Sequence, residues 1–272
     1  MKQGRLGFTE STLLFCNYLR NKNIEEVNSI EFIKYEASFI QWLFNTSGFF
    51  DLSFDYTYNY IHSPIYQKLM NEFFQMSQQS TFTRFAIHDS IFSKYLPDFY
   101  KNFNVVEYSF DKTLNEFYSF IRDRNVLIIN PMSKLMKSQY DSGNLFNINK
   151  FPRVNSIQYY INDYTFFNKC AQLNKDITSK QNSFEHVESI INDINCLNYD
   201  CVIISCGAIS SFIANRIDKD YLIIGSNLLT FFGIKHDRIK DNYESKYNEY
   251  WVDVPDECKP SDYKMIENGC YW

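Results

Sequence analysis

The sequence predicts an α/β fold whose sheet is mostly parallel and covered by helices on both faces, after a helical N-terminal third. Short strand-like and helix-like segments alternate from residue 80 onward, a pattern typical of parallel strands joined by right-handed crossovers. Three strand-like segments, 125–130, 201–205 and 221–225, are apolar without alternation, as expected for strands buried on both faces. Before residue 80, apolar residues recur every three or four positions, which indicates helices. We therefore expect a Rossmann-like architecture.

The first third is expected to contain three helices, over residues 10–20, 29–44 and 56–76. Within the second helix, Ile33, Ala37, Ile40 and Phe44 fall on one stripe. This stripe predicts the face of the helix that packs into the core.

Six strands are expected in the rest of the chain, over residues 81–87, 105–110, 125–130, 154–161, 201–205 and 221–225. Helix-like segments such as 112–123 and 183–195 separate most of them. The regular pattern ends after Phe232, and no repeat or linker divides the chain, so we expect one domain. Its expected parts are a helical part, a Rossmann-like core and an irregular tail that closes the site, at residues 1–79, 80–232 and 233–272.

The composition argues against several classes of protein. The 272 residues carry a formal net charge of −5 without a cluster of Lys and Arg, so nucleic-acid binding, which depends on neutralising phosphates, is not expected. The longest apolar run is far shorter than the roughly 20 residues that cross a bilayer, and the N-terminus has no apolar signal region. We therefore expect a cytoplasmic protein.

Seven cysteines are spread along the chain without a Cys-x-x-Cys pair, which predicts buried free thiols in a reducing compartment. Cys196, Cys201 and Cys206 are evenly spaced, but the last two bracket a predicted strand, whereas zinc ligands come in close pairs on turns. No metal site is therefore predicted.

Ligands of an open parallel sheet bind outside the carboxyl ends of its strands. Small and capping residues follow three predicted strands at the starts of helices: Pro131 and Ser133, then Gly207, Ser210 and Ser211, then Gly225, Ser226 and Asn227. Their backbone N–H groups are expected to face one shared crevice, which favours a nucleotide-like ligand. Turns between strands and helices also need such residues without any ligand, so each junction alone has a purely structural alternative.

A basic stretch follows the last predicted strand and helix. Lys235, His236, Arg238 and Lys240 lie close together in the sequence, which suits a diphosphate or another anion, the alternative being a solvated charged loop. Neither a G-x-G-x-x-G fingerprint nor a P-loop is present. The Asp-Lys-Asp segment at 218–220 has the spacing of an Asp-x-Asp metal motif, but it precedes a strand, so we predict a solvated turn there.

The most specific motifs in the second half of the chain are SCGAISS, FGIKHDR and ENGCYW. Together with the segments around them they resemble a set of little-characterised bacterial and viral proteins found with surface-glycan genes. The resemblance covers about residues 124–272. That set is similar to glycosyltransferase domains, including rhamnosyl-transferring ones of large chlorella viruses, and more loosely to the D-type glycosyltransferase fold.

The resemblance implies a nucleotide-sugar pocket lined by residues of the strand-end junctions, namely Asn130, Ser133, Gln139, Gly207, Ala208, Gly225 and Ser226. It also implies that Lys235 and Arg238 hold the diphosphate where other enzymes use a metal ion. Glu267, Tyr271 and Trp272 would close the site, and the indole would offer a flat apolar face to a sugar or base.

An inverting transfer needs a carboxylate that accepts the proton of the acceptor hydroxyl. Three residues are candidates: Glu36, where relatives of this set keep an acid, Asp89, which follows the strand 81–87, and Glu267. A surface position for Glu36 and a helix N-cap role for Asp89 are the alternatives.

Sequence and resemblance together predict a nucleotide-sugar-dependent glycosyltransferase of the hexosyltransferase type, acting in surface polysaccharide, capsule or glycan biosynthesis. The expected partners are a nucleotide sugar and a glycan acceptor, with a homo-oligomer or other glycan-assembly enzymes as further possibilities, and neither a metal nor a cofactor beyond the donor is expected. Met132, Thr230, His236 and Ile239 depart from the family's pattern. The departures at Thr230 and His236 favour the alternative, a catalytically silent nucleotide-binding or scaffold protein of the same fold.

Overall fold

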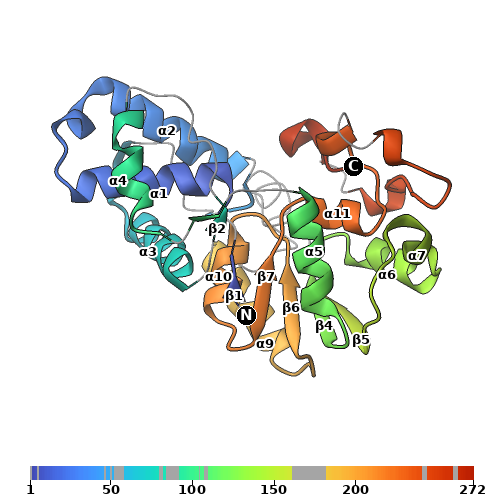
Figure 1. The fold of residues 1–272 in the computed structure, drawn as a ribbon. Helices are drawn as coiled ribbons and strands as arrows, with labels where there is room; N and C mark the ends of the chain where they lie inside the picture. The colour runs from blue at the N-terminus through green and yellow to red at the C-terminus, as the bar shows by residue number, and fades with distance from the viewer. Residues whose placement is uncertain are drawn as a thin grey trace.

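A five-stranded, all-parallel sheet forms the centre of the molecule (Figure 1). The computed structural model describes residues 2–4, 6–45, 47–49, 51, 58–79, 82–83, 92–103, 105–106, 110–160, 182–240, 244–259 and 263–272. The strand order is β1-β7-β6-β4-β5. The strands span Lys2–Gln3 (β1), Asn125–Ile129 (β4), Ser156–Tyr160 (β5), Cys201–Ile204 (β6) and Asp220–Ile223 (β7). The predicted fold class is confirmed.

Helices cover both faces of the sheet, because alternate residues of each central strand enter two different apolar cores. Leu127 and Ile129 of β4 belong to one core, whereas Val126 and Ile128 belong to the other. The first core also contains α9 and α10, and the second contains α5, α6, α7 and α11. These helices span Phe110–Ile121 (α5), Ser133–Asp141 (α6), Asn144–Asn149 (α7), Ser183–Ile194 (α9), Ile209–Asn215 (α10) and Asn227–Phe231 (α11).

The N-terminal part is helical as predicted and packs on the first core (Figure 1). Its helices span Phe8–Asn21 (α1), Ile30–Asn45 (α2), Pro64–Gln79 (α3) and Leu96–Tyr100 (α4), with 3-10 turns at Glu25–Asn28, Tyr58–His62 and Ser93–Tyr95. The helix predicted over 56–76 was placed too early. It begins at Pro64, whose fixed φ suits the first turn of a helix.

The buried face of α2 differs from the predicted stripe. Ala37 is exposed and Ile33 only half-buried, whereas Phe32, Glu36 and Leu43 are buried. Ile40 and Phe44 are buried as predicted, so the second half of the stripe is confirmed. The first half was wrong because the prediction counted apolar residues only and Glu36 is a buried acid. A buried carboxylate needs charged or hydrogen-bonding partners, and these lie on neighbouring helices.

Two predicted strands stand outside the main sheet. Within 81–87 the structure describes Phe82–Thr83 (β2), and within 105–110 it describes Val105–Val106 (β3) and Phe110, which begins α5. The strands β2 and β3 pair with each other in parallel. One edge of the five-stranded sheet is formed by β1, which pairs with β7. A strand of two polar residues has no hydrophobic pattern, so the sequence did not predict β1.

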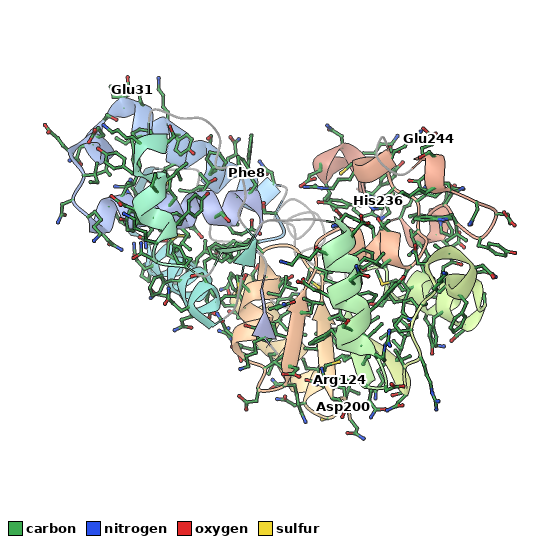
Figure 2. The ribbon with its side chains drawn as sticks, in the orientation of Figure 1. Phe8, Glu31, Arg124, Asp200, His236 and Glu244 are labelled. Atoms are coloured by element: carbon green, nitrogen blue, oxygen red, sulfur yellow. The ribbon has the colours of Figure 1, made fainter. Side chains whose placement is uncertain are left out.

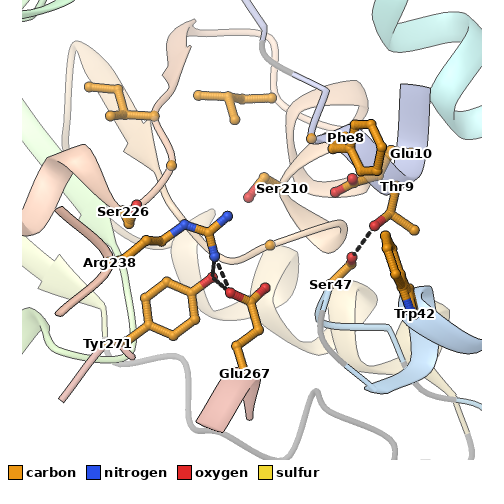
Figure 3. A pocket seen from close by; sticks show the side chains of 15 residues that line it. Phe8, Thr9, Glu10, Trp42, Ser47, Ser210, Ser226, Arg238, Glu267 and Tyr271 are labelled. Atoms are coloured by element: carbon orange, nitrogen blue, oxygen red, sulfur yellow. Dashed lines mark hydrogen bonds and ion pairs between the residues drawn. The ribbon is translucent and has the colours of Figure 1, made fainter. Parts of the chain in front are cut away.

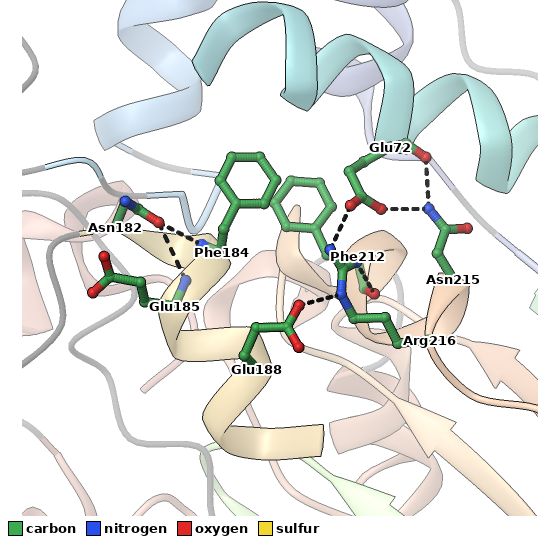
Figure 4. A network of polar contacts seen from close by, with 8 residues as sticks. All are labelled: Glu72, Asn182, Phe184, Glu185, Glu188, Phe212, Asn215 and Arg216. Atoms are coloured by element: carbon green, nitrogen blue, oxygen red, sulfur yellow. Dashed lines mark hydrogen bonds and ion pairs between the residues drawn. The ribbon is translucent and has the colours of Figure 1, made fainter. Parts of the chain in front are cut away.

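A polar network joins α3, α9 and α10 (Figure 4). Arg216, directly after α10, contacts Glu72 of α3 and Glu188 of α9, each at 2.7 Å. The side chain of Asn215 donates to the carboxylate of Glu72 at 2.7 Å. Beside this network the rings of Phe184 and Phe212 stack with their centroids 5.1 Å apart (Figure 4). The helical N-terminal part is thereby fixed to the sheet layer by both charge and apolar contact.

The described part of the segment 233–272 contains 3-10 turns and loops, in agreement with the predicted irregular tail. The turns span Asp237–Ile239, Glu244–Lys246, Asp256–Cys258, Tyr263–Met265 and Glu267–Gly269. The side-chain amide of Gln139 fixes this segment, because it donates to the carbonyl of Tyr250 at 3.0 Å and to those of Phe232 and Gly233 at 3.3 Å. Figure 1 shows the segment beside α11.

Candidate functional site

A pocket with a volume of about 410 Å³ lies at the carboxyl ends of β6 and β7 (Figure 3). Its walls come from the turns after these two strands, the beginning of α1, the end of α2 and the C-terminal segment. Figure 2 shows Phe8 and His236 toward this end of the sheet, and Arg124 and Asp200 at the other. The position agrees with the rule that open parallel sheets bind ligands at the carboxyl ends of their strands.

The wall formed by α1 carries a carboxylate. Glu10 occupies the first turn of α1, lines the pocket and is only 6% exposed. Its carboxylate lies against the backbone of Gly7, since a Cβ atom at Gly7 would be 2.3 Å from Oε2. Next to it, the hydroxyl of Ser47 donates to Thr9 Oγ1 at 2.9 Å. The first turn of α1 is therefore held against the loop after α2.

The turn after β6 is closed by the same loop. The N–H of Ala208 donates to the carbonyl of Ser47 at 2.6 Å. Gly207 has φ of +61°, and a Cβ atom there would lie 2.4 Å from that carbonyl oxygen. The close approach of Ser47 and the positive φ therefore require glycine at this position.

The opposite wall holds an arginine between two side chains of the C-terminal segment (Figure 3). Arg238 Nη1 donates to Glu267 Oε2 and, at 2.7 Å, to the hydroxyl of Tyr271. That hydroxyl also donates to Glu267 at 3.1 Å. Burial raises the pKa of Tyr271, so its hydroxyl stays protonated.

The backbone at Glu267 is unusual. Glu267 and the next residue, Asn268, have φ of +46° and +55°. Non-glycine residues at positive φ cost energy, and two in succession persist only where surrounding contacts fix them. The contacts of the Glu267 carboxylate with Arg238 and Tyr271 are contacts of this kind.

The pocket brings together six residues predicted from the sequence: Gly207, Ser210, Gly225, Ser226, Arg238 and Glu267. Tyr271, also implied by the resemblance, lies with them. These residues come from two strand ends and from the C-terminal segment, so this segment forms part of the pocket wall. That it closes a ligand site stays a prediction.

The junction after β4 lies outside this pocket. Asn130 and Ser133 are buried, at 5% and 0% exposure. The amide of Asn130 donates to the carbonyl of Ser205 at 2.8 Å and accepts from the N–H of Met132 at 2.7 Å. The hydroxyl of Ser133 donates to the carbonyl of Tyr160 at 2.8 Å. Side chains therefore fill the space between the carboxyl ends of β4 and β6. Three junctions were expected to share one crevice, but only the junctions after β6 and β7 line the pocket.

Other predicted residues lie elsewhere in the fold. Gln139 is buried and binds the backbone of the C-terminal segment, and Ala208 is buried behind the pocket wall. Glu36 is 1% exposed and is ion-paired with Arg20, so its alternative as a surface residue was wrong. The hydroxyl of Tyr66 also donates to Glu36 at 3.0 Å. Glu36 therefore belongs to a polar cluster inside the helical part and lies outside the pocket.

Lys235 and Trp272 line a second pocket, and Lys235 is paired with Asp253 at 3.2 Å. Lys235 and Arg238 therefore line different pockets in this structure. Asp89 lies outside the described residues. Asp218 and Lys219 are exposed at the far end of the sheet, as predicted, and Asp220 is paired with Arg124 at 2.5 Å.

Two residues of the pocket, Glu10 and Trp42, do not stand out in the sequence. Glu10 stands three residues after the N-cap Gly7, a spacing that indicates only a helix start. What places this helix start at the end of β7 is the pairing of β1 with β7, which the sequence does not reveal. Trp42 lies at the exposed end of an amphipathic helix, where no pattern distinguishes a pocket from solvent.

Among the described residues, no group of three or more His, Cys, Asp or Glu side chains is arranged to hold a metal ion. The described cysteines at 16, 196, 201, 206, 258 and 270 are free thiols. Within the same residues, no helix has the length and apolar character needed to cross a bilayer. Comparison with protein-family models, curated proteins and solved structures finds no match to this chain.

Proposed function

We propose that this chain is a nucleotide-sugar-dependent glycosyltransferase of surface-glycan biosynthesis, acting in the cytoplasm, and that the pocket at the ends of β6 and β7 is its donor site. The observation that carries the proposal is the position of Arg238 in that pocket, between the strand-end turns and two carboxylates. A diphosphate needs a cation with directed N–H groups, and a sugar transfer needs a carboxylate within the same site.

Arg238 is the residue proposed to bind the diphosphate. Its side chain is 45% exposed and lines this pocket, so a ligand can reach it. Binding would replace its contact with Glu267 by bidentate contacts with phosphate oxygens. The same positive charge would stabilise the nucleoside diphosphate as it leaves.

Glu10 is the carboxylate that we assign as general base. In a direct displacement, it would accept the proton of the acceptor hydroxyl while that oxygen forms a bond to the anomeric carbon and the bond to the diphosphate oxygen breaks. Figure 3 shows Glu10 and Glu267 on opposite walls. The Glu267 carboxylate already accepts hydrogen bonds from Arg238 and Tyr271, so we assign it to positioning Arg238.

Aromatic side chains complete the proposed donor site. Trp42 is 45% exposed and lines the pocket, and its ring packs against those of Phe39 and Phe8 with centroids 5.1 and 6.2 Å away. A supported, exposed indole gives a flat face on which a base or sugar ring can stack. The proposal therefore includes Trp42 as the stacking surface.

The test is a thermal-shift panel of UDP, GDP, dTDP, CMP and their sugars, with and without Mg²⁺, followed by calorimetry on variants. A ligand that binds only the native state must raise the unfolding midpoint. Arg238→Gln should weaken the selected nucleotide about ten- to hundredfold, since hydrogen bonds to charged groups contribute about 1.5–3 kcal/mol. Arg122→Gln, at an exposed arginine of the opposite sheet end, is the control. A flat panel, or equal affinity in both variants, would refute the proposal.

One observation favours the alternative, a catalytically silent nucleotide-binding or scaffold protein. The contacts of Arg238 with Glu267 and Tyr271 satisfy its charge without a ligand. A silent binding protein would bind one nucleotide sugar of the panel without transferring the sugar to any acceptor. A scaffold would show no shift of the unfolding midpoint with any compound of the panel.

A further inference from the structure

A second pocket, with a volume of about 380 Å³, lies within the C-terminal segment. Residues from 235 to 259 and Trp272 line it. In Figure 2, His236 and Glu244 lie together in this part of the molecule. The proposed donor site uses none of the residues of this second pocket.

A buried histidine in this pocket has an unused nitrogen. His236 is 4% exposed, and its Nδ1 atom has no hydrogen-bond partner among the described residues. Its Nε2 atom lies 3.3 Å from the hydroxyl of Thr230 in α11. Nδ1 is therefore the ring nitrogen that is left for a hydrogen bond with a ligand in the pocket.

The charged lining of this pocket is balanced. Three lysines and three carboxylates contribute to it: Lys235, Lys240, Lys259, Asp237, Glu244 and Asp253. A phosphate or a carboxylated ligand would meet as many negative as positive groups, which gives it no net attraction. A hydroxyl group both donates and accepts, so a ligand rich in hydroxyls can use the lysines and the carboxylates alike.

Two aromatic side chains add flat surface. Tyr247 and Trp272 both line the pocket, and Tyr247 packs against Trp251 with ring centroids 4.8 Å apart. The hydroxyl of Tyr247 is a second buried polar atom without a hydrogen-bond partner among the described residues. Buried polar atoms are rarely left unsatisfied in native proteins, and two in one cavity point to a ligand that satisfies both.

We infer that this second pocket binds one neutral saccharide unit, with His236 Nδ1 accepting from a sugar hydroxyl and the rings of Tyr247 and Trp272 contacting the sugar. As a subsite for the glycan that is extended, this inference rests on the proposed transferase function. Saccharide binding itself can be measured without any transfer, so the two claims can fail separately.

The test is a titration that follows the three tryptophan indole N–H signals by NMR. Trp42 reports on the first pocket and Trp272 on the second, and Trp272→Phe identifies the Trp272 signal. The probes are the methyl glycosides of glucose, mannose and rhamnose, with cyclohexanol and glucuronate as comparison compounds. We expect at least one methyl glycoside to shift the Trp272 signal saturably and to leave the Trp42 signal in place. Cyclohexanol should have no effect, and glucuronate should bind more weakly.

Variants test the contacts. In His236→Gln the side-chain amide replaces Nε2 and removes Nδ1, and in Tyr247→Phe the hydroxyl is removed. Each should weaken the glycoside about three- to tenfold, as expected for one hydrogen bond. Lys94→Gln, at an exposed lysine paired with Glu26 in the helical part, should change nothing. Unchanged signal dispersion shows that the variants are folded.

Three results would overturn the inference: no glycoside shifts the Trp272 signal, cyclohexanol shifts it equally, or the affinity survives both variants. If glycosides shift Trp272 while no nucleotide shifts Trp42, the second site stands and the donor site fails. If nucleotides shift Trp42 while no glycoside shifts Trp272, the donor site stands and the second site fails.

Discussion

The N–H of Ala208 donates to the carbonyl of Ser47 at 2.6 Å, and this single bond joins the helical part to the turn after β6. Ser47 lies directly after α2, and its hydroxyl also contacts Thr9 in the first turn of α1. The pocket therefore has walls from both parts of the chain, and its shape depends on this junction. Gly207, with no side chain, allows the two backbones to approach.

Replacing Gly207 tests the junction. Gly207→Ala should lower the free energy of unfolding by about 1–2 kcal/mol for positive φ, plus about 1–3 kcal/mol for the overlap with Ser47. Gly143→Ala is the matched control, because Gly143 has φ of +75° and a Cβ atom there would have no neighbour within 4 Å. Urea unfolding of both variants measures the difference. Equal losses in the two variants would show that the approach of Ser47 costs nothing.

Removing the charge of Glu10 tests its role as general base. Glu10→Gln should lower kcat about 10²- to 10⁴-fold, the range that general-base catalysis supplies, with little change in nucleotide affinity. Glu31→Gln, at an exposed glutamate of α2, is the control. Steady-state kinetics with the donor found in the nucleotide panel measures both parameters. If Glu267→Gln removes turnover and Glu10→Gln does not, the roles of the two carboxylates are reversed.

Much of the fold could be predicted from the sequence because its central strands are simple. Segments such as 201–205 are apolar on both faces and must be covered by helices, so they fix the layers of the fold. The order of the strands could not be read in this way. In particular, β1 has two polar residues and owes its place to pairing with β7, a contact between residues over 200 positions apart.

The site was predicted in part for the same reason. Gly207, Gly225 and Ser226 follow strands, and their place at the carboxyl edge is a consequence of the parallel sheet. Asn130 and Ser133 follow a strand too, but their side chains bind neighbouring backbone carbonyls and fill the space. Whether a polar residue binds a ligand or the fold depends on side-chain directions, which a turn sequence does not encode.

The titration of His236 makes stability depend on pH. Burial, together with the nearby charge of Arg238, lowers the pKa of His236 to about 4 from 6.5. As pH falls, the unfolded chain therefore takes up this proton first, so the native state is fully favoured above about pH 6.5 and loses stability between about pH 6.5 and 4. The loss in the free energy of unfolding approaches about 3 kcal/mol, the free energy that corresponds to a pKa shift of this size.

His236→Gln should flatten this pH dependence. The measurement is the free energy of unfolding by urea at several pH values from 7 to 4, taken as the difference between the variant and the native chain so that other groups cancel. His62→Gln, at an exposed histidine, should leave the slope unchanged. An unchanged slope in His236→Gln would mean that the imidazole titrates normally in the folded protein.

The contact between Glu72 and Arg216 should matter more for stability than the exposed ion pairs of the surface. The Glu72 side chain is 9% exposed and that of Arg216 is 20% exposed, and both also bind neighbours on other helices.

Glu72→Gln leaves Arg216 with one carboxylate partner, Glu188, so we expect a loss of about 2 kcal/mol in the free energy of unfolding. Asp98→Asn is the control, because Asp98 and Lys101 form an exposed ion pair, which should contribute little to the free energy of unfolding. Since Glu72 lies on α3 and Arg216 directly after α10, Glu72→Gln should also increase hydrogen exchange in both helices, whereas the control should not. Equal losses in the two variants would mean that apolar contacts alone, such as the stacked rings of Phe184 and Phe212, hold α3 against the sheet layer.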